Sequence, residues 1–177
     1  MARIVERVIV LVRCAMANEN FVRDYEVNAA MTLLELNDFI CADLGYDPEE
    51  MTTFFLADNR WRKLKEYTAV DMGYGDEADE NAPQPMENTH LWQVIHSADD
   101  RLIWVFDMLA DRAYFLEVVD AEDVEKDDKC PLVRFSHGKP LDQYDADGDG
   151  GGEKSIFEEM MDDFSDFGGD DSYDDEY

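Results

Sequence analysis

Basic residues are scarce in this sequence. It holds 15 Lys and Arg residues against 44 Asp and Glu residues, which gives a formal net charge of −29 at pH 7. So acidic a chain repels phosphate backbones and anionic lipid surfaces, and we expect no direct contact with nucleic acid or membranes. The charge favours a basic protein partner and binding that weakens as salt is added.

Cysteine pairs and long apolar runs are also missing. Cys14, Cys41 and Cys130 are odd in number and far apart, which suits a reducing cytoplasm better than a disulfide framework or zinc knuckle and favours buried thiols. No window reaches the roughly 18 apolar residues of a membrane helix. The run MARIVERVIVLVRC carries Glu6 and Arg7, so we interpret it as a strand and not as a signal peptide.

The sequence lacks motifs that indicate an enzyme class. It contains no P-loop, GxGxxG or GxSxG pattern, and its three histidines have no ligand-like spacing with the cysteines. Asp107 and Asp111 form a carboxylate pair, but turn chemistry explains them without catalysis. We therefore predict no cofactor and keep an unrecognised enzyme, with a pocket around Asp107, Asp111 and His96, as an alternative.

The strongest pattern that is present is a β-hairpin over residues 101–120. Leu102, Trp104 and Phe106 alternate with other apolar residues, then a polar break at 110–112 leads into a second alternating run. A strand that is apolar on both faces belongs inside a sheet. We expect further strands and a helix to cover this hairpin, because two strands alone are marginal in water.

The clearest helix signal lies at residues 32–44. Thr32 and Glu35 form a capping box, Met31 is placed to contact Leu36, and Gly45 follows as a left-handed C-terminal cap. Strands are expected near 3–14, 21–28, 51–58 and 60–67, a short helix after Thr89, and a short strand at 132–135. The prediction is a single α+β domain over residues 1–144, with a β-grasp-like mixed sheet covered by this one main helix.

A basic and aromatic cluster interrupts the acidic chain at RWRKLKEY. Arg60, Arg62 and Lys63 surround Trp61 there. Such a patch can bind nucleic acid, but in an acidic body it is more typical of an edge strand with local ion pairs. We interpret these four residues as an interaction surface for a protein partner.

Residues 145–177 form a tail of different composition. It holds 14 acids and one Lys, and Phe157, Phe164 and Phe167 alternate with the acids. This composition cannot bury a core and is typical of a disordered tail. Such a tail either supplies a second, flexible contact to the partner or only keeps the protein soluble.

The start of the tail resembles half of an EF-hand. Asp145, Asp147 and Asp149 alternate as calcium ligands do, and Gly150 follows at the sharp-turn position. The position that requires a bidentate glutamate is Ile156, however, and no amphipathic helix precedes the loop. A flexible acidic linker is the preferred interpretation, and calcium binding by these three aspartates is kept as an alternative.

The order of several motifs resembles the plasmid pRiA4b open-reading-frame-three family, in particular its acidic-tailed branch. The matching stretches are TLLELNDFICADLGYDPEEMTTFFLADNRW, KLKEYTAVDMG, THLWQVI and LIWVFDMLADRAYFLEV, and more weakly GDGGGEKSIFEEM. They cover roughly residues 4–120. The resemblance implies no activity, because the family has none established.

Three sites depart from the common family pattern. Family members carry Trp-Arg-Arg, His-Leu-His and YDFGD followed by Trp, where this chain has 21–23, 51–54 and 105–109 without those histidines, tryptophans or the glycine. Any chemistry that those residues carry in the family is lost here. The sequence thus favours a non-enzymatic protein-interaction module, with an acidic nucleic-acid mimic that occupies a DNA- or RNA-binding partner as a further alternative.

Overall fold

The computed structural model describes residues 5–12, 21–73, 80–125 and 130–144. They all belong to the first of two units into which the chain divides, Met1–Ala146 and Asp147–Tyr177. The elements in chain order are β1 (Val5–Val12), β2 (Val22–Asn28), α1 (Leu33–Leu44), β3 (Thr53–Ala57), β4 (Lys63–Thr68), β5 (Gln84–Pro85), a 3-10 turn η1 (Met86–Asn88), α2 (Leu91–Val94), β6 (Arg101–Asp107), β7 (Arg112–Glu125) and β8 (Leu132–His137).

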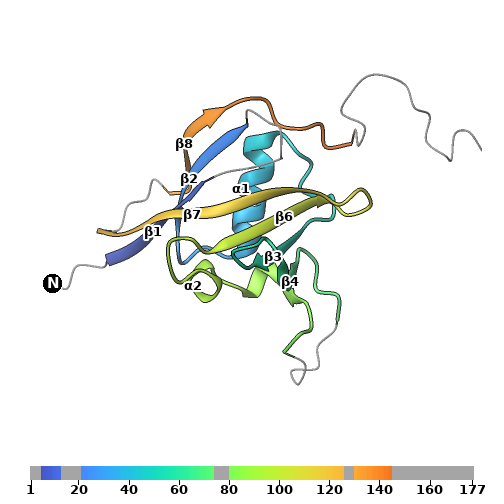
Figure 1. Cartoon of the computed structure of the whole chain (residues 1–177), viewed down its shortest axis with the longest axis horizontal. Coiled ribbons are helices and arrows are strands. Elements are labelled where there is room, and N and C mark those ends of the chain that lie inside the picture. The colour runs from blue at the N-terminus through green and yellow to red at the C-terminus, as the bar shows by residue number, and fades with distance from the viewer. Residues whose placement is uncertain (1–4, 13–20, 74–79, 126–129, 145–177) are drawn as a thin grey trace, which may run out of the picture. The chain divides into compact units, whose positions relative to one another are not determined.

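The strands form one mixed sheet, in the order β5-β4-β3-β6-β7-β1-β2-β8. Neighbouring strands are antiparallel except for the short parallel pair of β4 and β5. Figure 1 shows the β6–β7 hairpin in the middle of the sheet and α1 lying across it. The α+β class and the mixed sheet are confirmed, and α1 is the longest helix among the described residues.

Helix α1 begins and ends where its sequence signals predict. The Thr32 hydroxyl accepts a hydrogen bond from the Glu35 backbone N–H at 3.1 Å, and the Glu35 carboxylate accepts one from the Thr32 N–H at 2.8 Å. Gly45 ends the helix at φ 72°, a conformation that costs residues with a Cβ more than it costs glycine. Met31 and Leu36 are buried in the same cluster, as a hydrophobic staple requires.

The main core lies between α1 and the sheet. Leu36 and Ile40 from the helix pack with Trp104, Tyr114 and other buried side chains of the hairpin. A polar contact lies at the centre, where the Asn37 side-chain oxygen accepts hydrogen bonds from the Trp104 indole at 2.9 Å and the Thr52 hydroxyl at 2.6 Å. This contact fixes how the helix sits on β6.

The other face of the hairpin is apolar too, as its sequence predicts. Ile103 and Val105 are each 2% exposed and form a second cluster with Ala57 and Ala113. Phe55, Trp61 and Phe115 cover this cluster and are partly buried. The sheet is therefore packed on both faces around β6.

Several boundaries differ from the sequence prediction. Helix α2 begins after His90 and not after Thr89, whose hydroxyl instead donates to the Pro85 carbonyl oxygen. Strand β5 has only two residues, which is too short for a periodic pattern that would predict it. Strand β8 ends at His137, two residues beyond the expected end. None of the helices described is long and apolar enough to cross a membrane.

Candidate functional site

Asp107 closes the turn between β6 and β7. Its Oδ1 accepts hydrogen bonds from the backbone N–H groups of Leu109 at 3.2 Å and Ala110 at 3.1 Å. Its Oδ2 accepts a third from Nε of Arg112 at 2.9 Å. The Ala110 hydrogen bond above all, and also the guanidinium, lower the pKa of Asp107 below its ordinary value. The carboxylate stays ionised and makes the contacts of a turn acid.

Arg112 joins this turn to a distant part of the chain. Its remaining nitrogens donate to the backbone carbonyl oxygens of Asp142 and Gln143, both at 2.8 Å. Its side chain is only 10% exposed, and its guanidinium lies 4.9 Å from the centre of the Phe106 ring. A cation so enclosed fixes the position of residues 142–143 against the hairpin.

Gln143 continues the link to the segment that follows α1. Its side-chain oxygen accepts a hydrogen bond from the Asp47 backbone N–H at 2.8 Å, and its amide nitrogen donates to the Asp47 carbonyl oxygen at 3.2 Å. Beside it, the Tyr144 hydroxyl donates to the Glu50 carboxylate at 3.4 Å. Three segments far apart in the sequence are thereby held together.

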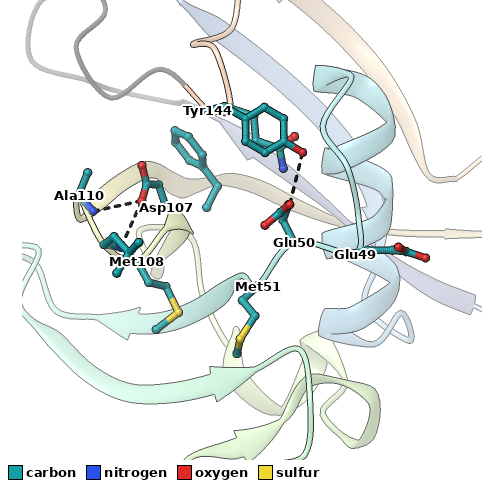
Figure 2. A pocket seen from close by; sticks show the side chains of 10 residues that line it. Glu49, Glu50, Met51, Asp107, Met108, Ala110 and Tyr144 are labelled. Atoms are coloured by element: carbon teal, nitrogen blue, oxygen red, sulfur yellow. Dashed lines mark hydrogen bonds between the residues drawn. The ribbon is translucent and has the colours of Figure 1, made fainter. Parts of the chain in front are cut away.

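These segments surround a pocket of about 740 Å³, which we name the Met108 pocket. It is lined by residues 49–51, by 106–110 at the end of β6 and in the turn, and by Gln143 and Tyr144. Figure 2 shows Met51 and Met108 on one side of it and Tyr144 with Glu50 on the other. Its volume lies in the range of sites that hold a small molecule or a peptide side chain.

The lining combines exposed apolar side chains with acids. Met51 is 49% exposed, Met108 is 48% exposed and Leu109 is fully exposed. Glu49 and Glu50 are exposed at the rim, and no Lys or Arg is among the lining residues described. Exposed apolar groups gathered at one place are typical of a binding surface.

The sequence predicted an interaction surface at a different turn, between β3 and β4. There Asp58 accepts hydrogen bonds from the backbone N–H groups of Arg60 at 2.8 Å and Arg62 at 2.9 Å, and from Nε of Arg62 at 2.7 Å. The hydrogen bond from the Arg62 backbone is the main cause of the lowered pKa of Asp58. This turn places Trp61 at φ 61°, a left-handed conformation that is rare for a residue with a bulky side chain.

Two neighbouring side chains of the sheet contact the Trp61 ring. It meets the Phe115 ring edge to face at 5.1 Å, and the Arg101 guanidinium lies 4.8 Å from the centre of the Trp61 ring. Arg101 also forms an ion pair with Glu117 at 3.4 Å and donates to the Asn59 carbonyl oxygen. The tryptophan is thus a fixed and partly exposed feature of the surface.

Two of the three cations in the predicted surface are already paired. Arg62 pairs with Asp58 and Lys63 with Asp111 at 3.0 Å, while Arg60 is exposed. The surface around Trp61 is therefore less positive than the run RWRKLKEY suggests, as the local ion-pair interpretation expected.

Of the residues of the enzyme alternative, Asp107 alone is among the described lining residues of the Met108 pocket. Asp107 lines the pocket, but Asp111 points to Lys63, and the His96 backbone N–H is bound to Asp100 at 2.6 Å. Burial raises the pKa of the Cys41 thiol to about 11, as expected for the predicted buried thiol, whereas Cys130 is partly exposed and Cys14 lies outside the described residues.

The tail residues with predicted roles lie outside the described residues. They are Asp145, Asp147 and Asp149 for calcium and Phe157, Phe164 and Phe167 for interaction. Within the part of the chain that the structure describes, no group of three or more His, Cys, Asp or Glu side chains is arranged to hold a metal ion.

Sequence reasoning missed the Met108 pocket. The sequence predicts the turn between the two strands but assigns no role to Met108 and Leu109 within it. Large apolar side chains at a hairpin turn, where polar residues are usual, were the signal that could have drawn attention to it.

Comparisons with known proteins establish the fold alone. No family model matches the chain, and no curated protein matches it. Among solved structures, the chain is similar to the crystal structure of a protein of unknown function from Methanosarcina mazei Go1, with 15% sequence identity and a TM-score of 0.61. The match covers 93% of this chain and 84% of that one.

Proposed function

We propose that this protein is a non-enzymatic interaction module that binds a basic protein partner. The globular body presents the segment 54–67 around Trp61, and the acidic, aromatic tail supplies a second contact. The resemblance to the pRiA4b open-reading-frame-three family stays a prediction and adds no activity to this proposal.

The observation that supports it best is the fixed position of Trp61. The Asp58 turn, the Phe115 ring and the Arg101 guanidinium all restrain this side chain before any partner arrives. A restrained aromatic side chain loses little conformational entropy on binding, and tryptophan is enriched among residues that dominate interface energies. The left-handed backbone at Trp61 also points to function, because strained residues gather at binding sites.

Charge supports a basic partner. The net charge of −29 attracts cations from a distance, and pairing has already neutralised Arg62 and Lys63 beside Trp61. The attraction acts mainly between exposed groups, so salt should weaken it.

The test is a pull-down from nuclease-treated lysate of the source cell at low and at high salt. We expect a basic partner that is lost at high salt and captured less well by a chain ending at Tyr144, which keeps the contacts of residues 141–144. The Trp61→Ala variant should lose most of the partner. Trp92→Ala is the matched control, because Trp92 is 56% exposed in α2. A partner retained equally at high salt, or by Trp61→Ala, would contradict the proposal.

A further inference from the structure

We infer that the Met108 pocket binds a peptide segment of a partner protein in which an apolar anchor side chain is flanked by Lys or Arg. The inference rests on the proposed function, because it adds a second docking site to the interaction module and specifies the chemistry of its partner. The Trp61 surface lies by the first residue of β6, Arg101, whereas the pocket lies by its last residue, Asp107. Trp61 and the residues that line the pocket can therefore be substituted separately, although Lys63 beside Trp61 pairs with Asp111 in the β6–β7 turn.

The walls of the pocket are in place without a ligand. Asp107 and Arg112 fix the turn, Arg112 fixes residues 142–143, and Gln143 is bound to Asp47 through two hydrogen bonds. A site that needs no rearrangement keeps more of its contact energy as affinity.

The apolar lining suits an anchor side chain. Met51 and Met108 are each about half exposed, and Leu109 is fully exposed beside them. Methionine side chains are flexible and polarisable, so they can adapt to anchors of different shape. Phe106, which is 3% exposed, is a further apolar residue of the lining.

The charges around the lining select the residues that flank the anchor. Glu49 and Glu50 belong to the pocket, and no Lys or Arg is among its described lining residues, whereas Asp107 is paired with the Arg112 guanidinium, which also donates to two carbonyl oxygens. A ligand therefore meets uncompensated negative charge at the rim, which favours Lys and Arg beside its anchor. A second copy of this chain fits poorly, because two bodies of charge −29 repel each other.

The experiment follows the methyl groups of methionine in the full chain by NMR. The probe is the synthetic peptide Lys-Arg-Leu-Phe-Arg-Lys, compared with Lys-Arg-Ala-Ala-Arg-Lys and Glu-Asp-Leu-Phe-Asp-Glu. We expect the first peptide to shift the methyl signals of Met51 and Met108 and the backbone amide signals of Leu109 and Ala110. The other two peptides should cause much smaller shifts at the pocket, since one lacks the anchor and the other carries the wrong charge.

Variants with matched controls separate apolar contact from charge. Leu109→Ser should weaken binding of the first peptide about tenfold, whereas Leu64→Ser should not, although Leu64 is 62% exposed on β4. The double reversal Glu49→Lys/Glu50→Lys should weaken it at least about tenfold. Its control is Glu80→Lys/Glu87→Lys, which changes two exposed acids by the same total charge away from the pocket.

Each other outcome has a definite meaning. Shifts confined to signals of residues 145–177 would show that the tail alone holds the peptide, which overturns the pocket inference and leaves the interaction module intact. Pocket shifts that are unaffected by the glutamate reversal would overturn the basic character of the ligand. An absence of shifts would overturn the inference, while the lysate experiment with Trp61→Ala still decides the proposed function independently.

Discussion

The β3–β4 turn and the β6–β7 turn are each built around an aspartate and an arginine that play the same roles. In each, one oxygen of an aspartate accepts two backbone hydrogen bonds within the turn, and the other oxygen accepts one from the Nε atom of an arginine four or five residues later. Asp58 pairs with Arg62 in the first turn, and Asp107 pairs with Arg112 in the second. The pKa of each aspartate is lowered as a result.

The two turns differ in what covers the arginine. The Arg62 side chain is 71% exposed, whereas that of Arg112 is 10% exposed and also bonds two carbonyl oxygens about thirty residues away. The first ion pair only shapes a local turn. The second holds distant segments together and thereby creates a pocket, so burial and not the local motif decides what the same pair of residues does.

Replacing each arginine by alanine should show the largest difference in stability between the two turns. Arg112→Ala leaves Asp107 without its cation and two carbonyl oxygens without a donor, so we expect a loss of about 3 kcal/mol in the free energy of unfolding. Arg62→Ala should cost at most about 0.5 kcal/mol, because its pair is exposed to solvent. Urea unfolding followed by circular dichroism measures both values. Equal losses would contradict the structural role assigned to Arg112.

The titration of Asp107 should produce a smaller and pH-dependent effect. Because its pKa is lowered from 3.8 in the folded chain, its ionised form stabilises the fold above that pH, and this contribution is lost as pH falls through the folded value. Asp107→Asn should cost about 1 to 2 kcal/mol at pH 7. The difference between the wild type and Asp107→Asn should shrink below about pH 4, and a constant difference would show that ionisation plays no part.

Local signals account for the part of the fold that the sequence predicted. The Thr32–Glu35 capping box and Gly45 act within one helical turn of the ends of α1, and the continuous apolar run of residues 102–106 directly reflects burial on both faces. Such signals can be recognised in the sequence because they consist of residues that are close together in the chain. The parallel partner β5 has no such signal, since its two residues are ordered by contact with β4.

The sequence signals the apolar residues of the β6–β7 turn but not the walls of the pocket, because contacts between distant residues bring those walls together. Nothing at position 112 indicates that its side chain binds the carbonyl groups of residues 142–143. Every residue has a backbone carbonyl group, so the residue types at 142 and 143 do not reveal these contacts. The Trp61 surface was predicted from local composition. Composition alone does not show, however, that Arg62 and Lys63 form ion pairs with aspartates of the same protein.

The left-handed backbone at Trp61 predicts that glycine is less destabilising than alanine at this position, which is the reverse of the order found at most positions. Trp61→Ala removes the ring and keeps a Cβ at φ 61°, whereas Trp61→Gly removes the ring and relieves that conformation. We expect Trp61→Gly to be more stable than Trp61→Ala by about 1 kcal/mol in urea unfolding. The reverse order would show that the strain is not present in solution.

The smallest effect should come from the ion pair that links the two turns, between Lys63 and Asp111. Both side chains are exposed, at 39% and 74%, so a double-mutant cycle with Lys63→Met and Asp111→Asn should give a coupling below about 0.5 kcal/mol. Asparagine is a suitable replacement, because position 111 has φ 51° and asparagine tolerates that conformation. Added salt should remove this coupling but leave most of that between Asp107 and Arg112, since buried charges are screened less. A coupling between Lys63 and Asp111 that resists salt would mean that the two turns form one cooperative surface, and the Trp61 surface and the Met108 pocket could then no longer be treated as independent sites.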